Sequence, residues 1–214
     1  RWLKDPCYMN GYINYMYQNG GNDRRYSESI ADASYARYLV NADSAFITAQ
    51  LDSMKSVYDR WSDHWDSSKN LYYIPAMPDA TEYTIASIDA SGGKDGFDDG
   101  EAFRPTINSY MYGNAMAISK IAALRGDKAL SEEYLQKALN LKRFVEKELW
   151  NDSLKHFTDR FKADNQYVHY WNFIRGRELA GFIPWYFNLP SNSQPYNSAW
   201  DHIKDTNRLL GKFG

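Results

Sequence analysis

A glycine-rich acidic segment in the middle of the chain is the first place where the residue types could do chemistry. Residues 89–105 read DASGGKDGFDDGEAFRP, with five acids and four glycines in seventeen positions. Glycines allow tight or left-handed backbone conformations, so such a segment can bring a side chain to the edge of a cleft. A carboxyl group held near Phe97 or Phe103, beside other carboxylates, retains its proton more readily, as a general acid requires. Asp95 is the candidate for that role.

The acidic segment also has two simpler interpretations, a solvated loop or a Ca²⁺ site. Its spacing fails the EF-hand pattern because Phe97 stands where a ligand belongs. The four histidines show no zinc-ligand spacing, and the single Cys7 allows neither an intrachain disulfide nor a multi-cysteine metal site. We therefore expect no cofactor, with Ca²⁺ at this loop as the alternative.

A second segment, residues 165–178 (NQYVHYWNFIRGRE), carries the residue types of a sugar-binding site. Aromatic faces stack on the C–H surface of a sugar, while guanidinium and carboxylate groups hydrogen-bond its hydroxyls. The alternative is that these aromatics seal the ends of helices. The candidate substrate-binding residues here are Tyr167, Trp171, Arg175, Arg177 and Glu178.

A third segment, residues 24–32 (RRYSESIAD), combines a helix-capping Ser27 with two acids. Glu28 and Asp32 would be like charges four residues apart, which is mildly unfavourable on an exposed helix. They are predicted either to line a substrate or to complement the dipole of a first helical turn. Arg104, which closes the acidic loop, is a further candidate for substrate binding.

Composition limits the class of protein. The chain has 214 residues, a net charge of −2, 43% hydrophobic and 24% charged residues, as in ordinary globular proteins. No apolar run approaches the ~20 residues that span a bilayer, and the near-neutral charge argues against a nucleic-acid surface. Aromatic residues reach 16%, which suits both sugar binding and a packed core. We expect neither a membrane nor a nucleic acid as partner.

The apolar spacing predicts a helical hairpin to position these loops. Residues 106–124 place apolar side chains three or four positions apart, with Pro105 in the first turn and Gly126 as terminator. Asp127 then caps a second helix, whose apolar face extends to Leu149.

An earlier hairpin follows the same plan. A helix ends near Val40, and Asp43 caps a second helix that continues through Trp61. Asp43 lies 84 residues before Asp127, and the strand-like turn at Trp65 lies 85 residues before that at Trp150. Two anchors at nearly one spacing predict repeat units of about 27–104 and 105–190.

Hairpins in series bury their faces only against neighbours, so the predicted fold class is all-α, a helical-hairpin toroid of the (α/α)6-barrel type. At ~84 residues per unit, the chain holds about two and a half hairpins and is one partial domain over residues 1–214. Because it starts at Arg1, we expect a processed or excised piece. Further helices are predicted over Lys4–Tyr17, Glu178–Asn188 and Tyr196–Leu210, with long loops over 74–104 and 158–177.

Three motifs follow one another along the chain: Ser91-Gly92 before Asp95, the helix from Asn108-Ser109-Tyr110 to Gly126-Asp127, and Gly181-Phe182-Ile183-Pro184. Their order resembles the six-hairpin glycosidases, which include the trehalase-like and mannosylglycerate-hydrolase-like families and the wider glycoside hydrolase family 63 group. The resemblance implies a toroid that hydrolyses a glycosidic bond with inversion, using a carboxylic acid and a general base on opposite faces of the sugar.

The resemblance places Asp95 at the general-acid position of the matching loop. Here the family's leading Glu is replaced by Ala90, and an extra residue separates Gly92 from Asp95, so Asp89 is the fallback acid. The family's base, a Glu near a Gly-Pro-x-Trp motif, has no match before Gly214. The expected protein is a secreted or periplasmic glycoside hydrolase, with a carbohydrate substrate and the remainder of the same polypeptide as partners.

Two other functions fit the same sequence. One is a non-catalytic helical scaffold or carbohydrate-binding module, whose acidic loop is solvated or holds Ca²⁺. The other is a polysaccharide lyase of related architecture, which needs a base such as Tyr167, His169 or Arg175 and an anionic sugar.

Overall fold

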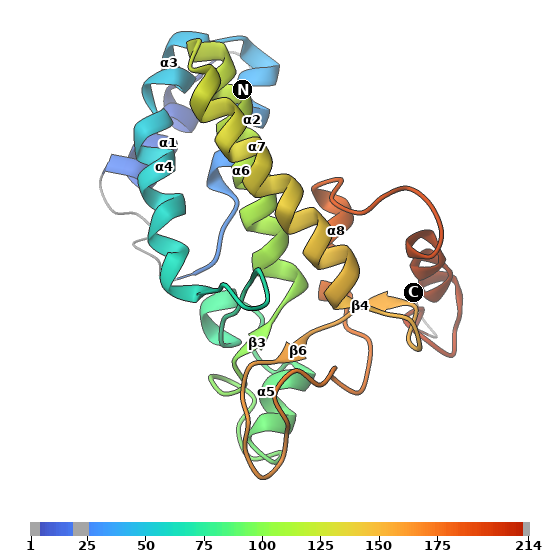
Figure 1. Cartoon of the computed structure of the whole chain (residues 1–214). Coiled ribbons are helices and arrows are strands. Elements are labelled where there is room, and N and C mark those ends of the chain that lie inside the picture. Colours follow the sequence, from blue (N-terminus) through green and yellow to red (C-terminus); the bar gives the residue numbers. More distant parts are fainter. Residues whose placement is uncertain (1–4, 19–25, 212–214) are drawn as a thin grey trace. The chain divides into compact units, whose positions relative to one another are not determined.

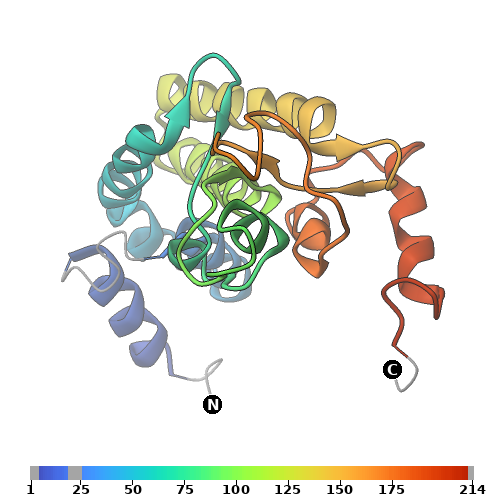
Figure 2. The ribbon, with the colours of Figure 1, turned by 90° about the horizontal axis from the view of Figure 1, so that it is seen from below.

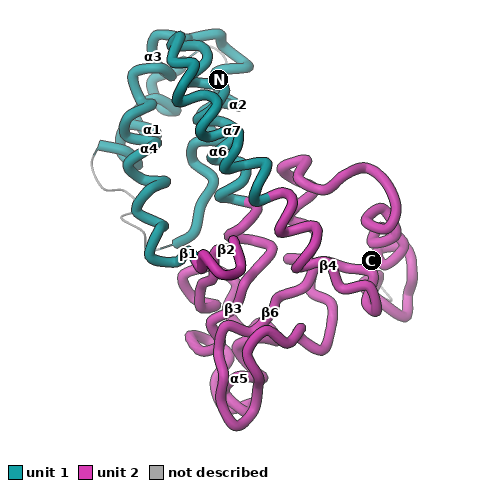
Figure 3. The backbone as a smooth tube through the Cα atoms, viewed as in Figure 1, with its two compact units in different colours: residues 1–65, 110–141 teal, residues 66–109, 142–214 magenta. Residues whose placement is uncertain are grey.

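The computed structural model describes residues 5–18 and 26–211 and consists of two compact units (Figure 3). Each unit combines two separate stretches of the chain. Unit 1 comprises residues 1–65 and 110–141, and unit 2 comprises residues 66–109 and 142–214. Helices dominate the described residues and each strand has only two residues, which confirms the predicted all-α class.

Unit 1 begins with short helices. The predicted cap is confirmed, because Asp43 Oδ1 accepts a hydrogen bond from Phe46 N at 3.0 Å. The single helix expected from Asp43 to Trp61 is instead broken at Gln50. The first expected helix starts at Cys7, and Lys4 lies outside the described residues. The elements are α1 (Cys7–Gln18), α2 (Ile30–Asn41), α3 (Ser44–Ala49), α4 (Leu51–Asp59) and the 3-10 helix η1 (Arg60–His64).

The second predicted hairpin is confirmed as α6 (Pro105–Arg125) and α7 (Lys128–Phe144), which lie side by side in Figure 1. Gly126 separates them with a φ of +84°, and Asp127 Oδ1 accepts from Leu130 N at 3.1 Å. Ser119 Oγ joins the two helices by donating to the carbonyl of Ser131 at 2.8 Å. The last predicted turn widens into the π-helix η3 (Val145–Leu149).

A side chain of α6 caps helix α2. Asn114 Oδ1 accepts from Ala31 N at 3.0 Å, and Asn114 Nδ2 donates to the carbonyl of Glu28 at 2.9 Å. The N-cap residue itself, Ser29, makes no side-chain cap. Because α2 starts at Ile30, Glu28 precedes the helix, and the expected cap by Ser27 with acids at i and i+4 is wrong.

The two strand-like turns form small hairpins, as predicted. β1 (Trp65–Asp66) pairs with β2 (Leu71–Tyr72), and β4 (Trp150–Asn151) pairs antiparallel with β5 (His156–Phe157). In the second hairpin, Trp150 lies opposite Phe157. These hairpins join the helices to the long loops.

The segment expected to be a long loop over residues 74–104 contains regular structure. It forms the 3-10 helix η2 (Met77–Asp79), helix α5 (Ile85–Ala90) and strand β3 (Ala102–Phe103). Strand β3 pairs antiparallel with β6 (Arg160–Phe161). Helix α5 is too short to be predicted from the periodicity of apolar residues.

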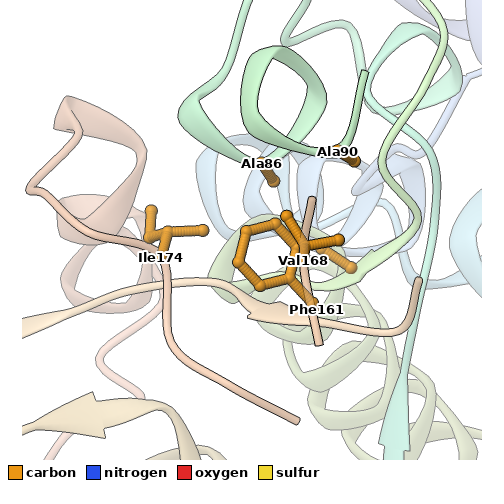
Figure 4. Packing of buried hydrophobic residues seen from close by; sticks show 6 residues of the cluster. Ala86, Ala90, Phe161, Val168 and Ile174 are labelled. Carbon is orange, nitrogen blue, oxygen red and sulfur yellow. The ribbon is translucent and has the colours of Figure 1, made fainter. Parts of the chain in front are cut away.

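Helix α5 packs its small side chains on the segment that follows β5. Ala86 and Ala90 lie against Phe161, Val168 and Ile174, all of them buried (Figure 4). In Figure 2, the green helix α5 and the orange segment that follows β5 lie side by side. This core joins the acidic loop to the aromatic segment.

The C-terminal part of unit 2 is less regular than expected. In place of helices over Glu178–Asn188 and Tyr196–Leu210, the chain forms η4 (Leu179–Phe182), α8 (Ile183–Tyr186) and η5 (Tyr196–Lys204). A side chain at Gly181 would lie 2.2 Å from the carbonyl oxygen of Phe157, so this segment approaches β5 through glycine. Among the described residues, no helix combines the length and apolar character needed to cross a bilayer.

Candidate functional site

A pocket of about 610 Å³ lies in unit 2, between the acidic loop and the aromatic segment. Three of the predicted site residues, Asp89, Tyr167 and Arg175, line it together. They come from segments about 80 residues apart, which the core around α5 brings together. The other polar residues in the lining are Gln166, His169 and Asn172.

Asp89 and Arg175 form an ion pair at this pocket. Arg175 Nε donates to both oxygens of Asp89, at 3.1 and 3.0 Å. The Arg175 side chain is 67% exposed, whereas that of Asp89 is 24% exposed. Within the described part of the chain, Asp89 is the only hydrogen-bond acceptor of Arg175. The terminal guanidinium nitrogens can therefore donate to a ligand.

Tyr167 lies directly against the glycine turn of the acidic loop. A methyl group at Gly92 would stand 2.5 Å from Tyr167 Cζ, and Gly92 has a φ of +67°. Nearly half of the tyrosine surface, 46%, is exposed. An aromatic ring that is supported on one side and exposed on another suits stacking on a sugar.

Asp95 lies on the exposed part of the same loop and not in the pocket lining. Its backbone N donates to Ser91 Oγ at 2.9 Å, and its Oδ1 accepts from Phe97 N at 2.8 Å. Phe103, the other expected apolar neighbour, is fully buried and packs edge-on against Trp171. The loop geometry thus fixes the Asp95 carboxylate through the backbone of Phe97.

Arg104 is buried beneath the loops and does not line the pocket. Its Nε donates to the carbonyl of Ile74 at 3.1 Å, and its Nη2 lies 3.3 Å from Thr84 Oγ1 and 3.4 Å from the carbonyl of Gly100. Its Nη1 is 3.3 Å from Asp159 Oδ2. Arg104 therefore ties several segments of unit 2 together.

Three acids form one interacting group with Arg104, and the sequence singled out only one of them. Burial raises the pKa of Asp159 well above its usual range; Arg104 opposes this shift, while Glu178 and Asp79 add to it. Burial also raises the pKa of Glu178, whose Oε1 accepts from Ile85 N at 2.8 Å. Glu178 thus supports the start of α5. Sequence reasoning missed Asp79 and Asp159 because nothing in their local pattern shows that they are buried.

Two of the predicted sugar contacts have protein partners outside the pocket. Lys69 Nζ lies 4.0 Å and the Arg160 guanidinium 4.8 Å from the centre of the Trp171 ring. Arg177 Nε donates to the carbonyl of Leu154 at 2.7 Å, in the turn between β4 and β5. The pocket lining contains neither Trp171 nor Arg177.

Glu28 and Asp32 belong to unit 1, whereas the pocket belongs to unit 2. Burial raises the pKa of Glu28 to about 7, against the opposing hydrogen bond from Ile30 N. Burial also raises the pKa of Asp32, and Lys120 opposes that shift. Acids with a strongly shifted pKa are frequent at functional sites, so Glu28 remains a candidate site residue. Arg24 and Arg25, from the same predicted segment, lie outside the described residues.

Side chains that bind metals do not cluster in the described ranges. No group of three or more His, Cys, Asp or Glu residues there has a geometry that could hold a metal ion.

Comparison with known proteins places this chain in a family. Over residues 1–214 the chain matches the family described as the mannosylglycerate hydrolase MGH1-like glycoside hydrolase domain. A solved structure named "Sialidase" matches 94% of the chain with 32% sequence identity and a TM-score of 0.81; the match spans 18% of that protein. No curated protein matches the chain significantly. The chain therefore belongs to the MGH1-like glycoside hydrolase domain family, as its resemblance to six-hairpin glycosidases predicted.

Proposed function

We propose that this chain forms part of a glycoside hydrolase and that the pocket of unit 2 binds a sugar of its substrate. The observation that carries the proposal is the meeting of Asp89, Arg175 and Tyr167 in one pocket of a chain from a glycoside hydrolase family. The aromatic ring supplies a stacking surface. The ion pair supplies acceptors and donors for hydroxyl groups.

The proposed reaction is hydrolysis with inversion. A carboxylic acid donates its proton to the glycosidic oxygen as the bond to the sugar carbon breaks, and a general base activates the water that attacks the opposite face. We assign the acid to Asp95, with Asp89 as the fallback. Asp89 is already bound to Arg175 through both oxygens, an arrangement that suits positioning of sugar hydroxyls. The base is not assigned to any residue of this chain.

We also propose a secreted or periplasmic protein, because such enzymes meet their polysaccharides outside the cytoplasm. The match spans only 18% of the solved "Sialidase" chain, which supports other parts of the same polypeptide as partners in the complete enzyme.

The test of the acid uses the full-length protein and two substrates with the same sugar. A p-nitrophenyl glycoside panel of glucosides, mannosides and arabinosides first identifies that sugar. Asp95→Asn should then lower kcat by about 100-fold or more on an alkyl glycoside, the usual contribution of a general acid. The same substitution should change kcat little on the glycosyl fluoride, because the fluoride leaving group needs no proton.

Asp98→Asn is the matched control, since Asp98 is an exposed acid of the same loop. Near wild-type turnover of Asp95→Asn on the alkyl glycoside would exclude Asp95 and shift the assignment to Asp89. No hydrolysis of any glycoside by the wild-type protein would overturn the proposed function itself.

Elimination by a polysaccharide lyase is the second candidate, because Tyr167, His169 and Arg175 line the same pocket. A lyase removes a proton next to the carboxylate of a uronic acid and leaves an unsaturated sugar. A rise in ultraviolet absorbance during turnover of a polyuronate would support elimination in place of hydrolysis.

A further inference from the structure

An exposed pair of aromatic side chains stands beside the pocket. Tyr83 is 69% exposed and Phe97 is 47% exposed. Their ring centres are 6.3 Å apart, and the rings meet edge to face at 65°. The pair belongs to unit 2, as the pocket does, and contributes nothing to the pocket lining.

The backbone at Tyr83 adopts an unusual conformation against Gly96. Tyr83 has a φ of +62°, a left-handed conformation that is unfavourable for a bulky side chain. Its N–H donates to the carbonyl of Gly96 at 2.6 Å, and Ser87 Oγ donates to the same carbonyl at 2.7 Å. The ring itself is largely exposed. Strained residues of this kind concentrate at binding sites.

Ile88 relates the aromatic pair to the pocket. It lines the pocket, and its Cγ1 lies 3.0 Å from the position that a side chain at Gly96 would take. The same space is bounded by Tyr83, whose Cδ1 lies 2.8 Å from that position. The pocket and the aromatic pair are therefore neighbours.

Asp95 stands between the two along the loop. Gly93 lines the pocket, Asp95 follows two residues later, and its Oδ1 accepts from the N–H of Phe97. The Asp95 carboxylate thus follows the pocket-lining glycines along the chain and is bonded to the backbone of Phe97, one member of the aromatic pair.

We propose that Tyr83 and Phe97 form a second sugar subsite, which binds the leaving group, so that the substrate is a glycoside whose leaving group is itself a sugar. This inference rests on the proposed function. The sugar whose anomeric carbon is attacked by water occupies the pocket. The leaving-group sugar stacks on the aromatic pair. Asp95 transfers its proton to the oxygen between them, and the bond to the sugar carbon breaks with its electron pair on that oxygen. Water adds its hydroxyl to that carbon and gives its remaining proton to the general base.

The test uses the full-length protein with Tyr83→Ala and Phe97→Leu. Each variant is assayed on a disaccharide that carries the sugar found with the p-nitrophenyl panel, and on the glycosyl fluoride of that sugar. Loss of one stacking contact should lower kcat/KM on the disaccharide by about tenfold. The fluoride has no leaving-group sugar, so its kcat/KM should stay within twofold of the wild type.

Tyr186→Ala is the matched control, because Tyr186 is 75% exposed in the same unit and outside the loop. Equal loss on both substrates, or no loss on either, would overturn the subsite.

Failure of the subsite is distinguishable from failure of the proposed function. A wild-type protein that cleaves neither substrate refutes both. A wild-type protein that cleaves the disaccharide, with a selective defect in Asp95→Asn and none in the aromatic variants, refutes only the subsite.

Discussion

The side chain of Asn108 takes the place of a strand partner for Tyr72. Asn108 Oδ1 accepts from Tyr72 N, and Asn108 Nδ2 donates to the carbonyl of Tyr72, both at 2.8 Å. The same Nδ2 also donates to the carbonyl of Arg104. Asn108 is fully buried, so these hydrogen bonds are shielded from solvent.

Asn108→Ala should therefore lower the free energy of unfolding by about 2–4 kcal/mol, because it removes three buried hydrogen bonds. Asn108→Asp should cost at least as much at neutral pH, since it removes both donated bonds and buries a charge. Urea denaturation measures both effects. Asn192→Ala, at an exposed asparagine, is the control and should change the value by less than about 0.5 kcal/mol. A similar small change in Asn108→Ala would contradict the described pairing.

Gly92→Ala should displace Tyr167, because the added methyl group would overlap its ring. We expect KM to rise with little change in kcat, as for loss of a substrate contact that is equal in the ground and transition states. Gly126→Ala separates this effect from backbone strain: Gly126 also has a positive φ, but nothing lies within 4 Å of its added methyl. Both variants should lose similar stability, and only Gly92→Ala should change KM. If Gly92→Ala had the same KM as Gly126→Ala, Tyr167 would be excluded as a sugar contact.

The ion pair between Asp89 and Arg175 should matter more for substrate than for folding. Partly exposed ion pairs contribute at most about 1 kcal/mol to stability, so Asp89→Asn and Arg175→Gln should change Tm little. If the pair binds sugar as one unit, each single variant should raise KM by about tenfold, and the double variant should be no worse than the more severe single one. Steady-state kinetics and thermal unfolding of all four proteins measure this. If the increases in KM of the two single variants combined independently in the double variant, the two residues would contact the substrate separately.

Glu28 should make unit 1 less stable as the pH rises. Its carboxyl group has a pKa of about 7 in the folded protein and an ordinary value of 4.5. Between these values the folded chain keeps a proton that the unfolded chain has released. The free energy of unfolding is therefore highest below the lower pKa and falls by up to about 3 kcal/mol as the pH rises through this window.

Glu28→Gln should remove this decline, because glutamine keeps an acceptor for Ile30 N and carries no charge. Denaturation at pH 5 and pH 8 should show a smaller difference for Glu28→Gln than for the wild type. Glu132→Gln, at an exposed glutamate of α7, should behave as the wild type does. An unchanged pH dependence in Glu28→Gln would argue against a buried acid at this position.

The helical hairpins could be predicted because their signals are local and repeated. Asp43 and Asp127 cap helices as their positions suggest, and Gly126 ends α6. The meeting of the acidic loop with the aromatic segment was not predicted, although both segments follow hairpins in equivalent positions of the repeat.

The buried charges and the fine structure of the loops could not be predicted in the same way. Asp159 and Glu178 are polar residues in polar segments, and only the fold shows that they surround Arg104. Trp171 was assigned to sugar stacking because of its type, but cations from Lys69 and Arg160 approach its ring in three dimensions. Interactions between residues distant along the chain decided these cases.

The many bonds of Arg104 have a consequence for ligand binding. One buried guanidinium holds Ile74 and Thr84, which precede α5, and Gly100, which lies within the acidic loop. The loop is thereby ordered when the chain folds, before any sugar arrives. A ligand then meets preset groups and loses little affinity to the conformational entropy of the protein.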